Sequence, residues 1–214
     1  MAAGTAIKIC GINSSDSLEA VIAARASHVG LNFFPPSPRF AAPDLAAQLS
    51  RQAAGRVIRV GVFVDADDAF LADTLAAAPL DALQFHGSES AERVAQAKAH
   101  FGLPVWKVLS VSAREDLQRA QAFSGAADFL LLDAKTPKGT LPGGMGLSFD
   151  WNLLGGWKSP LPWGLAGGLS PSNVAEAVRR TGAPLVDTAS GAESAPGVKD
   201  ASLIAAFCAA AASA

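Results

Sequence analysis

Eight short apolar runs alternate along the chain with segments of helical pattern. The runs occupy residues 7–11, 29–34, 57–65, 80–87, 104–110, 127–134, 161–168 and 183–191, and each stops at a polar or glycine-marked corner. The interval between successive runs suits a strand, a crossover helix and two loops. The runs are rich in Val, Leu and Ile, which is typical of parallel strands covered on both faces. The pattern predicts an α/β fold, a single (β/α)8 barrel of the TIM type over residues 1–214.

The segments between the runs predict amphipathic helices. Apolar residues recur at helical spacing in 15–27, 67–78, 88–102, 112–123, 170–182 and 198–212. The third of these segments ends at Gly102, as a helix stop should. Pro171 suits the first turn of the fifth.

Composition and charge exclude several classes of protein. Seventeen Lys and Arg against nineteen Asp and Glu give a net charge of −2, without the basic excess that nucleic-acid binding needs. The chain lacks an apolar stretch of about 18 residues and a signal-peptide pattern at its start. Cys10 and Cys208 are expected to be free thiols in a reducing compartment. We therefore expect a cytoplasmic protein, a monomer or a homodimer, with no membrane or nucleic-acid partner.

Glycines follow the seventh and eighth runs and indicate a phosphate site. Gly167 and Gly168 precede one predicted helix, and Ser190 and Gly191 precede a short helical turn. Glycines let backbone N–H groups approach an anion, and barrels of this class commonly bind phosphate between these two loops. A glycine pair alone is also what any tight turn needs, so the prediction depends on two consecutive loops. Residues 143–146 are a candidate third wall.

Reactive side chains stand at three other corners on the same predicted rim. Cys10 and Asp133 end the first and sixth runs, and Arg39 follows three prolines in the long loop 32–40. A cationic neighbour would favour the thiolate of Cys10 and burial would favour the protonated form of Asp133, which gives the base and acid that an isomerisation needs. Arg39 would pair with a carboxylate in two-point geometry. The structural alternatives are a core thiol, a capping or ion-paired aspartate and a solvated surface arginine.

The histidines do not indicate a metal site. His28, His86 and His100 lack the spacing of zinc ligands, and the chain has neither a P-loop nor a strand-linked GxGxxG. His86 could carry a proton, but a histidine at such a corner more often orients a loop or satisfies a backbone group.

Taken together, these segments resemble the phosphoribosylanthranilate isomerase family of tryptophan biosynthesis. The matching motifs are KICGI (8–12), NFFPPSPRF (32–40), VGVFVD (60–65), LQFHG (83–87), LLLDAK (130–135), GGMGLSFDW (143–151), LAGGLSPSNV (165–174) and VDTASGAES with PGVKD (186–200). They span nearly the whole chain in the family's order.

The resemblance implies an Amadori rearrangement of N-(5′-phosphoribosyl)anthranilate without metal or cofactor. It makes Cys10 the general base, Asp133 the general acid and Arg39 the partner of the anthranilate carboxylate. It also places the phosphate on the amides around Gly167, Gly168, Ser190 and Gly191, and gives Asp187 a role in orienting the sugar or the loops.

Two departures from the family's pattern bear on binding. Ala189 stands where the family often has a second serine, which moves one phosphate contact to the backbone. Met145 and Leu147 replace smaller or polar residues in the sixth loop (135–149), which leaves that loop's contacts open.

Two other readings compete. Another phosphosugar barrel would need metal-binding histidines, or an aspartate at position 10. A non-catalytic phosphate binder would have no reason to keep Cys10 and Asp133 together.

Overall fold

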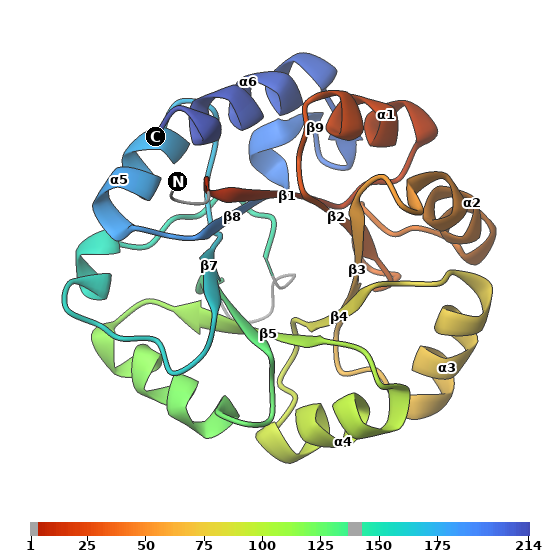
Figure 1. Ribbon diagram of the computed structural model, residues 1–214, viewed down its shortest axis with the longest axis horizontal. Helices are drawn as coiled ribbons and strands as arrows, with labels where there is room; N and C mark the ends of the chain where they lie inside the picture. Colours follow the sequence, from red (N-terminus) through yellow and green to blue (C-terminus); the bar gives the residue numbers. More distant parts are fainter. Residues whose placement is uncertain (1–3, 137–142) are drawn as a thin grey trace.

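Eight parallel strands form a closed barrel in chain order. The computed structural model describes residues 4–136 and 143–214, and within them the barrel runs β1 to β8 without a break (Figure 1). The strands are β1 (Ala6–Cys10), β2 (His28–Asn32), β3 (Ile58–Phe63), β4 (Ala82–Phe85), β5 (Val105–Val111), β6 (Phe129–Ala134), β7 (Trp163–Leu165) and β8 (Leu185–Thr188). Each lies within, or within one residue of, one of the eight apolar runs, so the predicted barrel is confirmed.

Helices cover the outside of the barrel as a ring (Figure 1). The α-helices are α1 (Ser15–Ala23), α2 (Pro43–Ala53), α3 (Asp68–Ala77), α4 (Ala91–Phe101), α5 (Val174–Thr181) and α6 (Ala201–Ala212). Three 3-10 helices, η1 (Arg114–Phe123), η2 (Trp151–Leu154) and η3 (Ser190–Ala192), and a small antiparallel pair, β9 (Glu193–Ala195) and β10 (Val198–Lys199), complete the described elements.

Local capping chemistry explains where the helices begin and end. The Ser90 side chain accepts from the Arg93 N–H at the start of α4, and Gly102 ends that helix in the left-handed conformation at φ 65°. The Asp200 side chain accepts from two backbone N–H groups at the start of α6.

Two expectations about the helices were wrong, and one helix was missed. Residues 114–123 form a 3-10 helix, and α2 was not among the predicted segments. Pro171 precedes α5, which begins at Val174. The Asn173 side chain accepts from the Ser170 N–H and donates to the Gly168 carbonyl, so these bonds hold residues 168–173 in a turn and delay the helix.

The core has two layers. A large apolar cluster fills the space between strands and helices. A smaller one, which includes Val60, Trp106 and Leu131, fills the barrel interior. Both cysteines lie within the described residues and form no disulfide, and Cys208 is buried on α6, as predicted.

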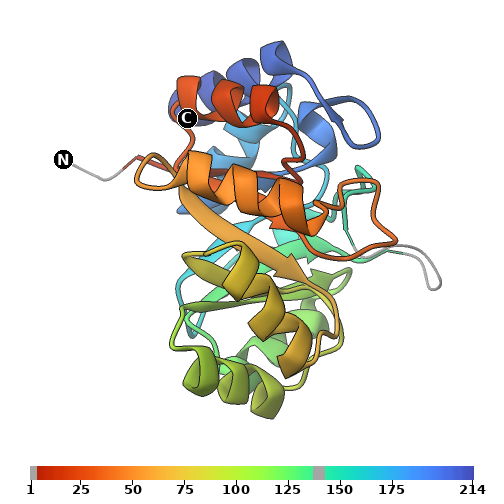
Figure 2. The same ribbon diagram turned by 90° about the vertical axis from the view of Figure 1, so that its right-hand side faces the viewer.

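The carboxyl ends of the strands meet at one rim. Figure 2 shows the loop after β2 and the described part of the loop after β6 at this rim. Side chains alternate along a strand, so inward-facing residues near each carboxyl end share one space above the interior cluster. In the described part of the chain no helix combines the length and apolar character that crossing a membrane requires.

Candidate active site

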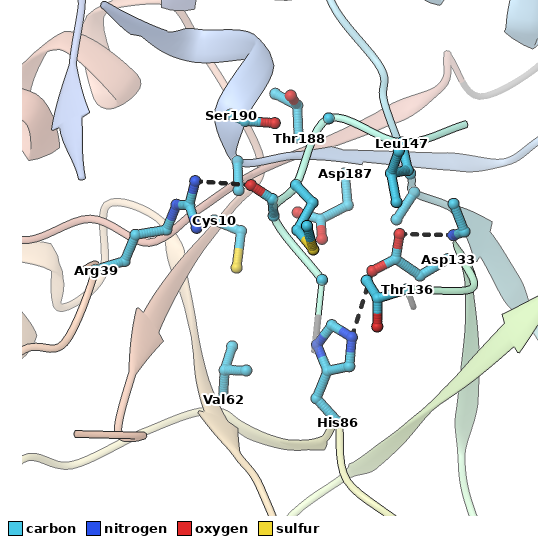
Figure 3. A pocket seen from close by; sticks show the side chains of 18 of the residues that line it. Cys10, Arg39, Val62, His86, Asp133, Thr136, Leu147, Asp187, Thr188 and Ser190 are labelled. Atoms are coloured by element: carbon cyan, nitrogen blue, oxygen red, sulfur yellow. Dashed lines mark hydrogen bonds and ion pairs between the residues drawn. The ribbon is translucent and has the colours of Figure 1, made fainter. Parts of the chain in front are cut away.

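A cavity of about 830 Å³, open to solvent, occupies the rim formed by the strand ends. Its lining brings together seven of the eight residues that the sequence nominated, namely Cys10, Arg39, Asp133, Gly167, Gly168, Asp187 and Ser190 (Figure 3). Within the described residues, the eighth, Gly191, is outside the lining.

Cys10 ends β1 with its sulfur directed into the cavity (Figure 3). Burial raises the pKa of the Cys10 thiol, Asp187 adds to that effect, and the nearby Lys8 and Lys199 ammonium groups oppose it, with a net pKa above the usual value. The cationic neighbour that we expected is therefore present, but the expected lowering of the thiol pKa is wrong because burial outweighs it.

Asp133 is the last residue but one of β6, and both of its carboxylate oxygens are held. Oδ1 accepts from the Ala134 N–H at 2.8 Å, and Oδ2 lies 3.3 Å from the His86 Nε2 (Figure 3). His86, at the end of β4, thus fixes the candidate acid. This role differs from the loop contact that we considered more common for such a histidine.

Arg39 is buried in an ionic cluster and is not a solvated surface residue. Its Nε and Nη2 donate to the two carboxylate oxygens of Glu193, each at 2.7 Å, and Nη2 also donates to the Gly144 carbonyl at 3.0 Å. Lys199 donates to Glu193 at 2.6 Å and to the Ala189 carbonyl at 2.9 Å. Two cations against one carboxylate leave a net positive charge at this side of the cavity, which suits an anionic group.

The loops after β7 and β8 are joined behind the cavity wall. The Thr188 hydroxyl donates to the Leu169 carbonyl at 2.7 Å. A Cβ on Gly191 would lie 2.0 Å from the same carbonyl oxygen, so only glycine permits this approach. Gly191 therefore shapes the wall from behind, whereas Gly167 and Gly168, both at positive φ, present backbone to the cavity.

The described part of the sixth loop closes against the same wall. A Cβ on Gly168 would lie 2.9 Å from the Gly146 carbonyl oxygen and from the Leu147 backbone. Residues 143–147 line the cavity, as predicted for a third wall, and Met145 and Leu147 are largely exposed. Residues 137–142 of this loop lie outside the described residues.

Asp187 is the last residue but one of β8 and pairs with a lysine that the sequence analysis did not consider. Lys8 Nζ lies 3.0 Å from the Asp187 Oδ1, and the Lys8 side chain is 0% exposed. Burial alone would lower the pKa of Lys8, but Asp187 and Cys10 outweigh burial and raise it above the usual value. Lys8 therefore remains charged inside the barrel. Among the described residues there is no group of three or more His, Cys, Asp or Glu side chains able to hold a metal ion.

Comparison with known proteins identifies the family. The family model for N-(5′-phosphoribosyl)anthranilate isomerase matches residues 7–210. The chain is 55% identical over 202 residues to N-(5′-phosphoribosyl)anthranilate isomerase of Paramagnetospirillum magneticum, covering 94% of each chain. The chain belongs to the N-(5′-phosphoribosyl)anthranilate isomerase family.

Solved structures agree with this assignment. The phosphoribosylanthranilate isomerase of Thermotoga maritima superposes with a TM-score of 0.88 at 32% identity, covering 98% of this chain and all of the other. A second phosphoribosylanthranilate isomerase structure, in complex with reduced 1-(o-carboxyphenylamino)-1-deoxyribulose 5-phosphate, superposes at 0.85 and 31% identity, with the same coverage. The barrel, the cavity and the family therefore point to the same class of chemistry.

Proposed function

We propose that Cys10 and Asp133 are the general base and the general acid of the isomerisation that this member of the family catalyses in tryptophan biosynthesis. The reaction is the Amadori rearrangement of N-(5′-phosphoribosyl)anthranilate to 1-(2-carboxyphenylamino)-1-deoxyribulose 5-phosphate. The observation that carries the assignment is a single cavity lined by both the Cys10 thiol of β1 and the Asp133 carboxyl group of β6.

The first two proton transfers then each have a named protein group. Asp133 protonates the furanose ring oxygen, and the C1′–O bond breaks to give an open-chain Schiff base. Cys10 removes the proton from C2′, and the electron pair forms the enolamine. Reprotonation at C1′ and loss of the hydroxyl proton at C2′ give the ketone. His86 and the Ala134 N–H hold the Asp133 carboxyl group in place for the first step.

The two anionic ends of the substrate fix the sugar between these groups. Arg39, backed by Lys199, takes the anthranilate carboxylate. The backbone around Gly167, Gly168 and Ser190 takes the phosphate, with Gly191 shaping the loop and Ala189 contributing backbone only. Orientation of this kind contributes several kcal/mol to a rate, on the order of 7 to 11 in well-oriented cases.

The direct test is growth of a bacterium that lacks this isomerase on medium without tryptophan, together with turnover of the purified protein measured by separating substrate from product. We expect growth and turnover from the wild-type chain. Soluble protein that binds phosphoribosyl ligands but gives neither result would favour a non-catalytic binder.

We also infer a cytoplasmic location and a monomeric or homodimeric state, with no nucleic-acid partner. The low charge and the absence of a basic excess support the last of these. Light scattering of the purified protein measures the oligomeric state, and a mass beyond two chains would contradict the inference.

A further inference from the structure

We propose that Lys8 is a positioning residue for the base: its buried ammonium group, held by Asp187, lies beside the Cys10 sulfur and stabilises the thiolate that removes the C2′ proton. This inference rests on the role proposed above for Cys10. It gives a function to a fully buried charge that the acid–base scheme does not use.

Strand geometry places the ammonium beside the sulfur. Lys8 and Cys10 are two residues apart on β1, so both side chains point into the barrel. Asp187 is the direct partner of Lys8 in the β1–β8 pairing, and Gly30 is the partner of Cys10 in the β1–β2 pairing. The Asp187 carboxylate therefore approaches Lys8 from β8. On the other side of β1, Gly30 of β2 has no side chain to fill the space next to Cys10.

Gly30 leaves the space that the two groups share. A Cβ at this position would lie 2.7 Å from the Cys10 Sγ and 3.2 Å from the Lys8 Nζ. Both atoms therefore lie over the same point of β2. A larger residue at position 30 would displace the sulfur, the ammonium or both.

The charges around Cys10 show why a fixed cation is needed there. Burial and the Asp187 carboxylate raise the pKa of the thiol, whereas Lys8 is the foremost of the groups that lower it, ahead of Lys199 from β10. Arg39 also faces the sulfur from the loop after β2. The pKa of Lys8 itself is raised, so it acts as a permanent charge.

The remaining titratable groups nearby influence Asp187 or adjoin Lys8. Asp133 and His86 influence Asp187 across the cavity. His28, paired with Lys8 in the β1–β2 register, lies below, where burial and then Lys8 lower its pKa to about 4. His28 is therefore neutral at physiological pH and adds no charge.

A purely structural role for the buried pair is the competing explanation, and it makes a different prediction. Removing one partner of a buried ion pair destabilises a protein strongly, whatever the function of the pair. It would not, however, move the pH at which Cys10 becomes reactive.

The experiment measures the pH dependence of two rates in a Cys208→Ala background, which leaves Cys10 as the one thiol. The first is alkylation by iodoacetamide, which follows the thiolate, and the second is kcat/KM for the isomerisation. In Lys8→Met, which removes the charge at similar volume, we expect both curves to move to higher pH by about one unit or more. That shift corresponds to about a tenfold lower rate near neutral pH, recovered at higher pH.

A second variant keeps the test decisive if Lys8→Met alone is unstable. Lys8→Met with Asp187→Asn removes both charges and leaves no unpaired carboxylate. Because the Lys8 ammonium lies beside the sulfur over Gly30, whereas the Asp187 carboxylate approaches from β8, the double variant should still become reactive at higher pH than the wild type. The midpoint of its pH curve should lie at a lower pH than that of Lys8→Met. Thermal unfolding and circular dichroism confirm that each variant is folded.

The outcomes separate this inference from the proposed function. Curves of unchanged midpoint in folded Lys8 variants, with Cys10→Ala inactive, would overturn the role of Lys8 alone. Shifted alkylation with an active Cys10→Ala variant would overturn both, because the residue that Lys8 serves would not be the base. Shifted curves for both rates, with Cys10→Ala inactive, support both.

Discussion

Replacing Arg39 by alanine tests whether this residue binds the substrate's carboxylate. The side chain is 9% exposed and donates two hydrogen bonds of 2.7 Å to Glu193, so the guanidinium is held in place before substrate arrives. In Arg39→Ala the carboxylate of Glu193 keeps its 2.6 Å bond from Lys199 and is not left unpaired. The fold should therefore survive, while the net positive charge at this side of the cavity disappears.

The expected magnitude follows from the hydrogen bond that is lost. A hydrogen bond to a charged group contributes about 1.5 to 3 kcal/mol, which corresponds to about a 10- to 150-fold rise in KM. We expect kcat to fall less than KM rises, because the phosphate contacts still orient the sugar and Arg39 contacts a part of the substrate that carries the same charge in the ground and transition states. Arg39→Lys should restore little, since an ammonium group cannot reproduce the two-point contact with Glu193.

The assay compares the natural substrate with an analogue in which aniline replaces anthranilate and the carboxylate is missing. Steady-state kinetics of wild type and Arg39→Ala with both compounds give the coupling between the guanidinium and the carboxylate. We expect Arg39→Ala to affect the analogue by less than about threefold. An unchanged KM for the natural substrate, or an equal loss with both compounds, would refute the reasoning.

Three further predictions concern stability and loop structure. Glu193→Gln leaves two buried cations without a counter-charge, so we expect a loss of about 3 to 5 kcal/mol and a melting temperature lower by about 6 to 20 °C, seen by calorimetry. An undiminished melting temperature would count against the cluster. Gly191→Ala forces a Cβ against the Leu169 carbonyl and should abolish measurable binding of inorganic phosphate. In Gly182→Ala the Cβ meets open space and the left-handed backbone is strained only at the end of α5, so phosphate binding should stay intact. Equal phosphate affinity in both would disprove the loop junction. His28, whose pKa burial and Lys8 lower to about 4, is protonated more in the unfolded chain, so stability is complete above about pH 6.5 and is lost as the pH falls towards 4. In His28→Gln, the free energy of unfolding measured with urea should fall by about 1 to 3 kcal/mol less than in the wild type as the pH is lowered through this window. An equal fall in both proteins would exclude His28 as its cause.

The sequence was most informative about the strands and about the residues at their carboxyl ends. Apolar runs ending at polar corners identify parallel strands, and closure of the barrel brings their ends together. Cys10 and Asp133 could therefore be assigned to one cavity although they are far apart in the chain. That the chain is one domain stays a prediction.

Contacts between loops could not be predicted from the pattern of apolar and polar residues. Glu193 reaches Arg39 only because β9 folds back over the rim, and no periodicity encodes that return. Lys8 gave a signal that could have been used, since a lysine two residues before Cys10 in a barrel strand must point inward. Residues 114–123 bury an apolar face, as the pattern indicated, but they do so as a 3-10 helix. The spacing of apolar residues did not distinguish its hydrogen-bond pattern from that of an α-helix.

The pKa of the Cys10 thiol could not be predicted from the sequence either. The expectation of a cationic neighbour was met, but the net pKa depends on how deeply the sulfur is buried. Burial depth is a property of the whole packed barrel, and residue identity alone does not give it.

The most direct measurement is single-turnover conversion of substrate by Cys10→Ala and Asp133→Asn, each compared with wild type and checked for binding of the reduced product analogue. The asparagine keeps the shape of the side chain, including an acceptor for the Ala134 N–H, and removes only the acid. We predict that both variants fold, bind the analogue and turn over substrate about 100- to 10,000-fold more slowly. Retention of more than about a tenth of wild-type turnover by either variant would contradict its assignment as the base or the acid, because a group that transfers the proton contributes at least about 100-fold.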